Sequence, residues 1–126
     1  MDSTRTFLYI YLGISIITSV FAQLTMKYGM QGFGEPKNLV SIIFMFLNPY
    51  ILAGIFLYLF SMFFWINVLS KIELSAAYPF ASLGIILTVI LSSLILSENI
   101  PLIRWIGILT VLSGVYLIVS SHKVKD

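Results

Sequence analysis

The sequence predicts an all-α membrane protein in which four transmembrane helices form one bundle. The 126-residue chain is 60% hydrophobic and only 10% charged, whereas soluble domains are about a quarter charged. Its apolar residues fall into four continuous runs, each close to the roughly 20 residues that a helix needs to cross a bilayer. The turn-forming and charged residues gather between these runs.

The four predicted spans are residues 7–28, 50–70, 74–97 and 100–120. Helices are expected, because in lipid every backbone N–H and C=O group must be satisfied within its own segment. Tilted barrel strands alternate over about ten residues, and these runs are longer and continuous. The short links favour antiparallel neighbours, so we expect a single transport domain over residues 1–126.

Two segments leave alternatives open. Residues 39–47 are too few to cross the membrane and predict either a short interfacial helix or an extension of the second span, kinked at Pro49. At the N-terminus, Arg5 and an apolar stretch ending in Val20-Phe21-Ala22 are also typical of a cleavable signal peptide. We favour a retained span, because the apolar run continues to Tyr28.

Composition excludes several functions. A net charge of +2 without a basic patch argues against nucleic acid as a partner. The chain has no cysteine, and its single His122 lies in the C-terminal tail. With no catalytic triad, no metal-ligand cluster and no phosphate-cradling glycine loop in the sequence, we expect neither an enzyme nor a metal or other cofactor.

The charges at the two membrane surfaces nearly balance. With the N-terminus inside, four cations lie inside and three outside: Arg5, Lys71, Lys123 and Lys125, against Lys27, Lys37 and Arg104. Such a weak bias fits an N-in, C-in chain only loosely. The alternative is a chain that inserts both ways and pairs as an antiparallel dimer, the geometry that inverted-repeat transporters use.

The first span carries a polar stripe with a spacing of four: Ser15, Ser19, Gln23 and Lys27. Such residues either bond neighbouring helices, for about 0.6–2 kcal/mol each, or line a substrate path. A stripe that ends in Lys27 suits an anionic group such as a phosphate, although lysine also snorkels to headgroups.

The third and fourth spans carry helix-distorting and small residues. Pro79 and Gly84 predict a kink, which forms either the moving wall of a transport chamber or a static bend. Gly107 and Gly114 share one face of the last span and predict a close helix contact, either between two copies or within one chain.

Other polar and aromatic residues remain candidates. Glu98 and Arg104 flank the last hairpin, where they form a surface ion pair or guard an entrance. Trp65 and Tyr78 lie near polar residues and are expected to face substrate.

Two segments resemble a known family: Ala22-Gln23-Leu24-Thr25-Met26-Lys27 and Ala77-Tyr78-Pro79-Phe80-Ala81-Ser82-Leu83-Gly84. With the four short spans, they resemble the small multidrug resistance-like branch of the drug/metabolite transporter superfamily. Glu98-Asn99, followed by Arg104-Trp105-Ile106-Gly107, is most similar to the aminoarabinose-phosphoundecaprenol flippase subunits of that branch.

The resemblance implies a dimer with a chamber lined by the first three spans. Ser19 stands where the proton-coupled exporters of the branch carry an essential glutamate, and none of the first three spans contains an acidic residue. A serine neither exchanges protons near neutral pH nor attracts a cation by charge. The implied substrate is a polyisoprenyl-phosphate-linked sugar, with Lys27 near the phosphate and Gln23, Tyr78 and Ser82 along the path.

We therefore expect a flippase-like transporter in a bacterial inner membrane, working by alternating access. Its partners would be the lipid substrate and either a second copy or a similar small subunit. One alternative is a proton-coupled drug or cation exporter that uses another acid, such as Glu98. The other is a regulatory membrane subunit that transports nothing by itself.

Overall fold

The computed structural model describes residues 3–122, which form six α-helices and no strand. The helices are α1 (Ser3–Phe33), α2 (Leu39–Phe46), α3 (Pro49–Leu69), α4 (Leu74–Ala81), α5 (Leu83–Ile95) and α6 (Leu102–His122). Four segments are long and apolar enough to cross a membrane: α1, α3, α4 together with α5, and α6. The predicted all-α class with four transmembrane helices is confirmed, while the dimer stays a prediction.

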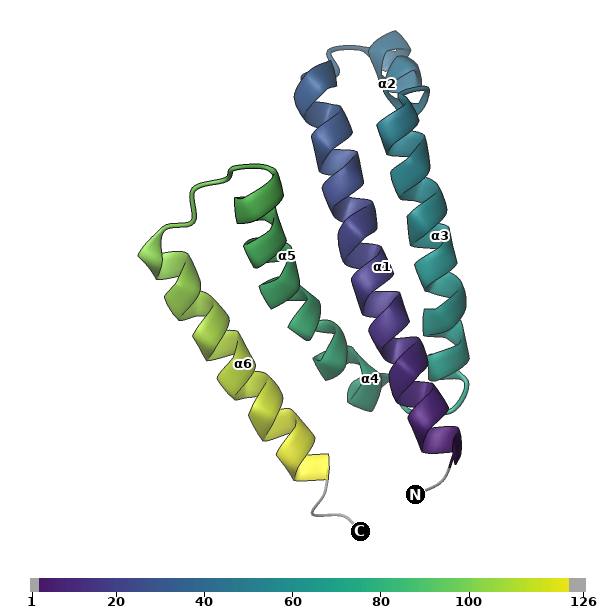
Figure 1. Ribbon diagram of the computed structural model, residues 1–126, viewed down its shortest axis with the longest axis vertical. Helices are drawn as coiled ribbons and strands as arrows, with labels where there is room; N and C mark the ends of the chain where they lie inside the picture. Colours follow the sequence, from purple (N-terminus) through teal and green to yellow (C-terminus); the bar gives the residue numbers. More distant parts are fainter. Residues whose placement is uncertain (1–2, 123–126) are drawn as a thin grey trace.

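α1 and α3 form the tightest helix pair and lie side by side along most of their length (Figure 1). Small residues let them approach: a Cβ atom added to Gly54 of α3 would lie 2.9 Å from the carbonyl oxygen of Ala22 in α1. The buried Ser15 hydroxyl donates a hydrogen bond to the carbonyl oxygen of Ser61, at 3.1 Å. This pair is the most closely packed part of the described chain.

α2 is a separate short helix, because a side-chain cap marks its own start and another marks the start of α3. Asn38 and Ser41 form a reciprocal capping box at its start. Asn48 then caps α3 by accepting a hydrogen bond from the N–H of Tyr50, and Pro49 occupies the first turn of α3. The alternative of one extended helix kinked at Pro49 is therefore wrong.

The third membrane segment is broken where the sequence predicts a kink. Pro79 lies inside α4 and has no N–H to donate to the carbonyl of Ser75. Ser82 separates α4 from α5, and its N–H is shared between the carbonyl oxygens of Tyr78 and Pro79, at 3.3 and 3.2 Å. The helix is interrupted at this point; that Pro79 and Gly84 form a kink that moves during transport stays a prediction.

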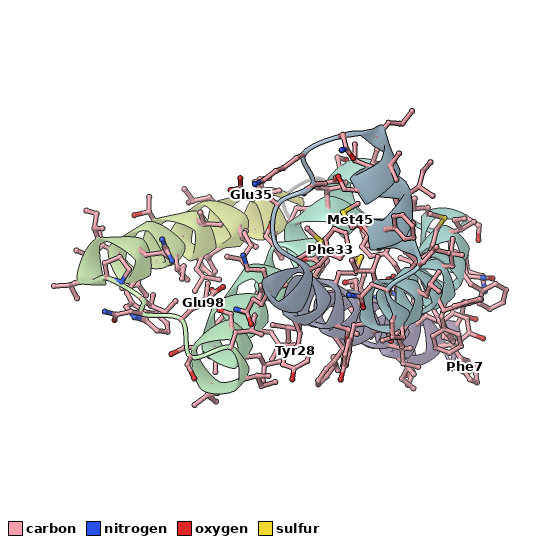
Figure 2. All side chains as sticks on the ribbon, turned by 90° about the horizontal axis from the view of Figure 1, so that it is seen from above. Phe7, Tyr28, Phe33, Glu35, Met45 and Glu98 are labelled. Carbon is pink, nitrogen blue, oxygen red and sulfur yellow. The ribbon has the colours of Figure 1, made fainter. Side chains whose placement is uncertain are left out.

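Seen from above, α5 and α6 lie on one side of α1, and α3 with α2 lies on the other (Figure 2). The main contacts of α6 are with α4 and α5. Ile108 is the one buried residue between positions 102 and 121. A Cβ atom on Gly107 or on Gly114 would meet nothing within 4 Å. The face that these glycines share is thus open within the described chain.

The start of α1 and the end of α6 lie at the same end of the molecule (Figure 1), as an even number of crossings requires. Arg5 and Lys71 are at this end, while Lys27, Lys37 and Arg104 belong to the opposite end. Lys123 and Lys125, which entered the comparison of the two membrane surfaces, lie outside the described residues. The direction of insertion stays a prediction.

Candidate functional site

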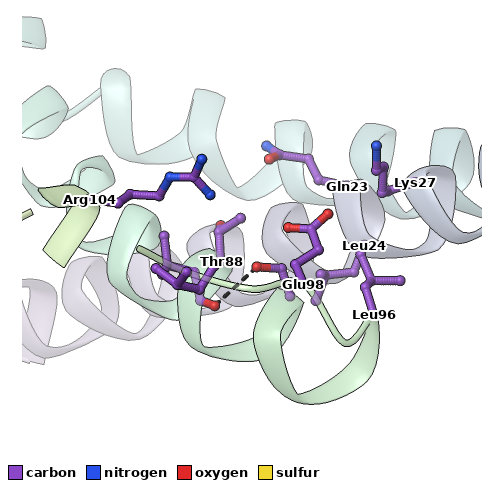
Figure 3. A pocket seen from close by; sticks show the side chains of 10 residues that line it. Gln23, Leu24, Lys27, Thr88, Leu96, Glu98 and Arg104 are labelled. Carbon is purple, nitrogen blue, oxygen red and sulfur yellow. Dashed lines mark hydrogen bonds between the residues drawn. The ribbon is translucent and has the colours of Figure 1, made fainter. Parts of the chain in front are cut away.

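A cavity of about 340 Å³ opens between the C-terminal half of α1, α5 and the loop that leads into α6. Ten residues line it: Gln23, Leu24, Lys27, Thr88, Val89, Ser92, Leu96, Glu98, Ile100 and Arg104. It therefore brings together Gln23 and Lys27 of the predicted polar stripe with Glu98 and Arg104, the predicted entrance residues. Figure 3 shows these side chains around the opening.

The helical twist of α1 decides which members of the polar stripe reach this cavity. A spacing of four overshoots one turn of 3.6 residues, so the stripe rotates by about 40° at each step and about 120° in total. Ser15 consequently faces α3, whereas Gln23 and Lys27 are exposed at the cavity. The stripe is a helix contact at one end and a cavity lining at the other.

Glu98 is directed into the cavity by the turn that ends α5. Ser97 has a left-handed backbone conformation, with φ of 56°, which reverses the chain after the helix. The N–H of Glu98 then donates to the carbonyl oxygen of Ser92, at 3.3 Å. Glu98 is half-buried as a result, while the two cations across the opening, Lys27 and Arg104, are exposed.

Arg104 reaches the same cavity from the first turn of α6. Its N–H donates to the carbonyl oxygen of Pro101, at 3.0 Å, which fixes where the helix begins. Figure 3 shows Arg104, Gln23, Glu98 and Lys27 directed toward the same opening. Two basic side chains and one carboxylate leave one net positive charge, so the cavity suits an anion that also carries hydrogen-bonding groups.

Two polar residues of the cavity were not singled out from the sequence. Thr88 and Ser92 lie on α5, where their hydroxyls donate to the carbonyl oxygens of Gly84 and Val89, at 2.7 and 3.0 Å. Their oxygens remain able to accept hydrogen bonds from a ligand. The sequence signal that could have identified them is the spacing of four between Gly84, Thr88 and Ser92, which places them near one face of the helix.

The other predicted substrate-binding residues lie elsewhere. The hydroxyl of Ser19 donates to the carbonyl oxygen of Ile16, at 2.8 Å, within its own helix. Trp65 and Tyr78 contact each other edge to face, with ring centroids 6.1 Å apart, and Ser82 marks the break between α4 and α5. None of these four residues lines the cavity, and their roles stay predictions.

α5 meets α1 between this cavity and the other end of the molecule. Gly84 is buried there, and a Cβ atom added to it would lie 3.3 Å from Cγ2 of Ile16 and 3.6 Å from Cγ2 of Val20. The glycine brings α5 against branched apolar side chains. These three residues, called here the central contact, separate the cavity from the other end of the molecule.

Among residues 3–122, no group of three or more metal-ligating side chains is gathered. The described chain has four helices that are long and apolar enough to cross a membrane, and a small charged cavity between α1, α5 and the start of α6, which are features of a multi-pass membrane protein. A model of the EamA-like transporter family matches residues 12–120. Because this covers most of the chain, the protein belongs to that family.

Curated relatives extend over nearly the whole chain. A probable 4-amino-4-deoxy-L-arabinose-phosphoundecaprenol flippase subunit ArnF of Serratia proteamaculans is 33% identical over 93% of this chain and 95% of its own. The probable ArnE subunit of Hamiltonella defensa is 28% identical over 87% of this chain and 94% of its own. The probable ArnF subunit of Photorhabdus laumondii is 29% identical over 87% of this chain and 94% of its own.

These relatives confirm the resemblance to flippase subunits that the sequence motifs indicated. They and the family are transporters, in agreement with the expectation that the chain is not an enzyme. No solved structure matches the chain significantly.

Proposed function

We propose that this protein is a small flippase that moves a polyisoprenyl-phosphate-linked sugar across a bacterial inner membrane by alternating access. The names of the curated relatives support the class of substrate. The whole chain, residues 1–126, acts as one transport domain. Its cavity of about 340 Å³ has room for a sugar phosphate, while the polyisoprenyl tail stays in the lipid.

The observation that carries the proposal is the convergence of Lys27 and Arg104 on one cavity from two different helices. Both cations can hold phosphate oxygens, and arginine can do so with two parallel hydrogen bonds. Gln23 adds an amide that both donates and accepts. A phosphate that leaves the headgroup layer would thus replace its hydrogen bonds to water with hydrogen bonds to these three side chains.

Glu98 gives the same cavity a second specificity. The relatives' substrate carries an amino group as well as a phosphate, as its name states. Near neutral pH such an amine is cationic, and the half-buried carboxylate of Glu98 can accept its hydrogen bonds. A zwitterionic headgroup would therefore satisfy Lys27, Arg104 and Glu98 together.

The route between the membrane surfaces is the seam between α1 and the α4–α5–α6 segment. Opening the seam requires α5 to leave the central contact at Gly84. The break at Ser82, next to Pro79, gives α5 a point about which it can tilt without moving α4. The predicted gating role of Pro79 and Gly84 belongs to this motion, and Trp65, Tyr78 and Ser82 remain proposed contacts for the substrate.

A dimer completes the transporter in this proposal. The open α6 face around Gly107 and Gly114 is the surface on which a partner helix would pack. The partner is a second copy or a similar small subunit, and a chain with balanced charges at its two ends can supply the antiparallel orientation.

Transport by purified protein in proteoliposomes tests the function. We expect wild-type protein to move a fluorescent aminoarabinose-phosphoprenol between leaflets, and the double variant Lys27→Gln/Arg104→Gln to lose at least about tenfold in rate, as expected for a lost charge-assisted contact. Lys37→Gln is the matched control, because Lys37 is an exposed lysine that does not line the cavity. Equal rates for the double variant and the wild type would refute the assigned site.

A second candidate function rests on Glu98, the half-buried acid of the cavity. It could couple cation export to protons in place of the glutamate that Ser19 replaces. An imposed pH gradient distinguishes the two functions: an exporter accumulates cationic dye in proportion to the gradient and loses this with Glu98→Gln. A flippase equilibrates its lipid without any gradient.

A further inference from the structure

A second charged cavity lies at the other end of the same seam. It has a volume of about 740 Å³ and is formed by the start of α1, the turn between α3 and α4, α4 itself and the last turns of α6. Its charged lining residues in the described chain are Arg5, Lys71 and Glu73, all exposed. The function proposed above uses none of these three residues.

The two cavities carry matching sets of charges. Arg5 and Lys71 face one carboxylate, Glu73, just as Lys27 and Arg104 face Glu98. Among the described residues, each cavity thus has one net positive charge at its end of the molecule. Glu73 makes no side-chain hydrogen bond that caps α4, so its carboxylate is available to a ligand.

The two sites also share one face of α1. Arg5 and Gln23 are 18 residues apart, which is five full turns, so they point in the same direction about 27 Å apart. Tyr9 of the second cavity and Lys27 of the first have the same separation. This distance approaches the roughly 30 Å thickness of a hydrocarbon core, which puts the cavities at the headgroup levels of opposite leaflets.

The central contact lies between the two sites along this face. Ile16 and Val20 of α1 lie between them and pack against Gly84 of α5. Pro79, next to the break in the third span, lines the second cavity. A tilt of α5 about this break would therefore join the two cavities.

We propose that the cavity around Arg5 and Lys71 is a second binding site for the isoprenyl-phosphate headgroup, at the opposite membrane surface. The inference rests on the proposed function, since it makes this cavity the site that the headgroup occupies before or after crossing. Arg5 and Lys71 hold the phosphate, and Glu73 takes the place that Glu98 has in the first cavity. Each chain then offers two sites for one kind of headgroup.

Native mass spectrometry with geranyl phosphate, a short isoprenyl phosphate, tests this directly. We expect two bound molecules per wild-type chain, and two for the control Lys37→Gln. Arg5→Gln/Lys71→Gln should retain one, with binding to the altered site weakened about tenfold or more. Because both side chains are exposed, the helix content and melting temperature of this variant should match those of the wild type.

The reciprocal variant separates this inference from the proposed function. If Lys27→Gln/Arg104→Gln loses one molecule and Arg5→Gln/Lys71→Gln loses none, the second site is refuted while the first cavity stands. If only Arg5→Gln/Lys71→Gln loses binding, the second site stands and the first assignment fails. Wild-type protein that binds no geranyl phosphate, or binds phosphatidylglycerol equally well, would overturn the inference, because the site would then not select an isoprenyl phosphate.

Discussion

The hydroxyl of Ser15 in α1 donates a hydrogen bond to the backbone carbonyl oxygen of Ser61 in α3, at 3.1 Å, and both residues are buried. Ser61 in turn donates its own hydroxyl to the carbonyl oxygen of Tyr58, within α3. The two serines are small enough to let the helices approach and polar enough to bond across the contact. They join the two helices near the middle of each, and neither serine lines a charged cavity.

Ser15→Ala should lower the free energy of unfolding by about 0.6 kcal/mol and at most about 2 kcal/mol, the range for hydrogen bonds between membrane helices. Equilibrium unfolding in mixed detergent micelles measures this difference. Ser113→Ala is the control, because its hydroxyl donates within the exposed helix α6, to Leu109, and its loss should change stability little. Equal losses for the two variants would mean that the contact with Ser61 contributes nothing.

Gly54→Ala should destabilise the α1–α3 pair more strongly than any single hydroxyl deletion. The added Cβ atom would lie 2.9 Å from the backbone carbonyl oxygen of Ala22, which cannot move aside without shifting the helix. We expect a loss of about 1–3 kcal/mol, typical of overpacking, measured in the same unfolding experiment. Gly13→Ala is the matched control on α1, where a Cβ atom meets nothing within 4 Å.

Asn48 performs two tasks that two substitutions can separate. Its side-chain oxygen caps α3 by accepting from Tyr50, at 2.9 Å, and its amide nitrogen donates to the carbonyl oxygen of Gly29, at 3.3 Å. Asn48→Ala loses both and should cost about 0.5–2 kcal/mol of stability. Asn48→Asp keeps the cap alone and should cost less; a loss as large as that with alanine would show that the cap contributes little to stability.

Pro79→Ala should slow transport without destabilising the fold. Alanine restores an N–H group that can bond to the carbonyl of Ser75, so α4 and α5 would approach one continuous helix. If the break allows α5 to tilt, the rate of lipid movement in proteoliposomes falls while the unfolding free energy stays equal or rises. Pro49→Ala is the control, since proline in the first turn of α3 replaces no internal hydrogen bond.

The membrane helices could be predicted from the sequence, because a long apolar run in lipid can satisfy its backbone hydrogen bonds only as a helix. The break near Pro79 followed from a missing N–H in the same way. The kink considered at Pro49 was wrong, because the cap that Asn48 supplies starts a new helix there. Local chemistry was thus sufficient at Pro79, whereas the equally local cap by Asn48 was missed.

The candidate site was less predictable. The spacing of four on α1 drew attention to Gln23 and Lys27, but their meeting with Glu98 depends on how the seam between α1 and α5 packs. The same spacing included Ser15, which the twist of the helix turns toward α3. Trp65 and Tyr78 contact each other away from this cavity, a placement that follows from packing between helices.

In the proposed transporter, the central contact of Ile16, Val20 and Gly84 also decides where a membrane voltage acts. Water in the two charged cavities would carry the bulk potential inward from each side, so that most of the voltage falls across this thin apolar layer. Moving one elementary charge through 100 mV involves about 2.3 kcal/mol. A headgroup with one phosphate and one ammonium group crosses such a field with no net electrical work, whereas the same phosphate without its amine would be driven to one side.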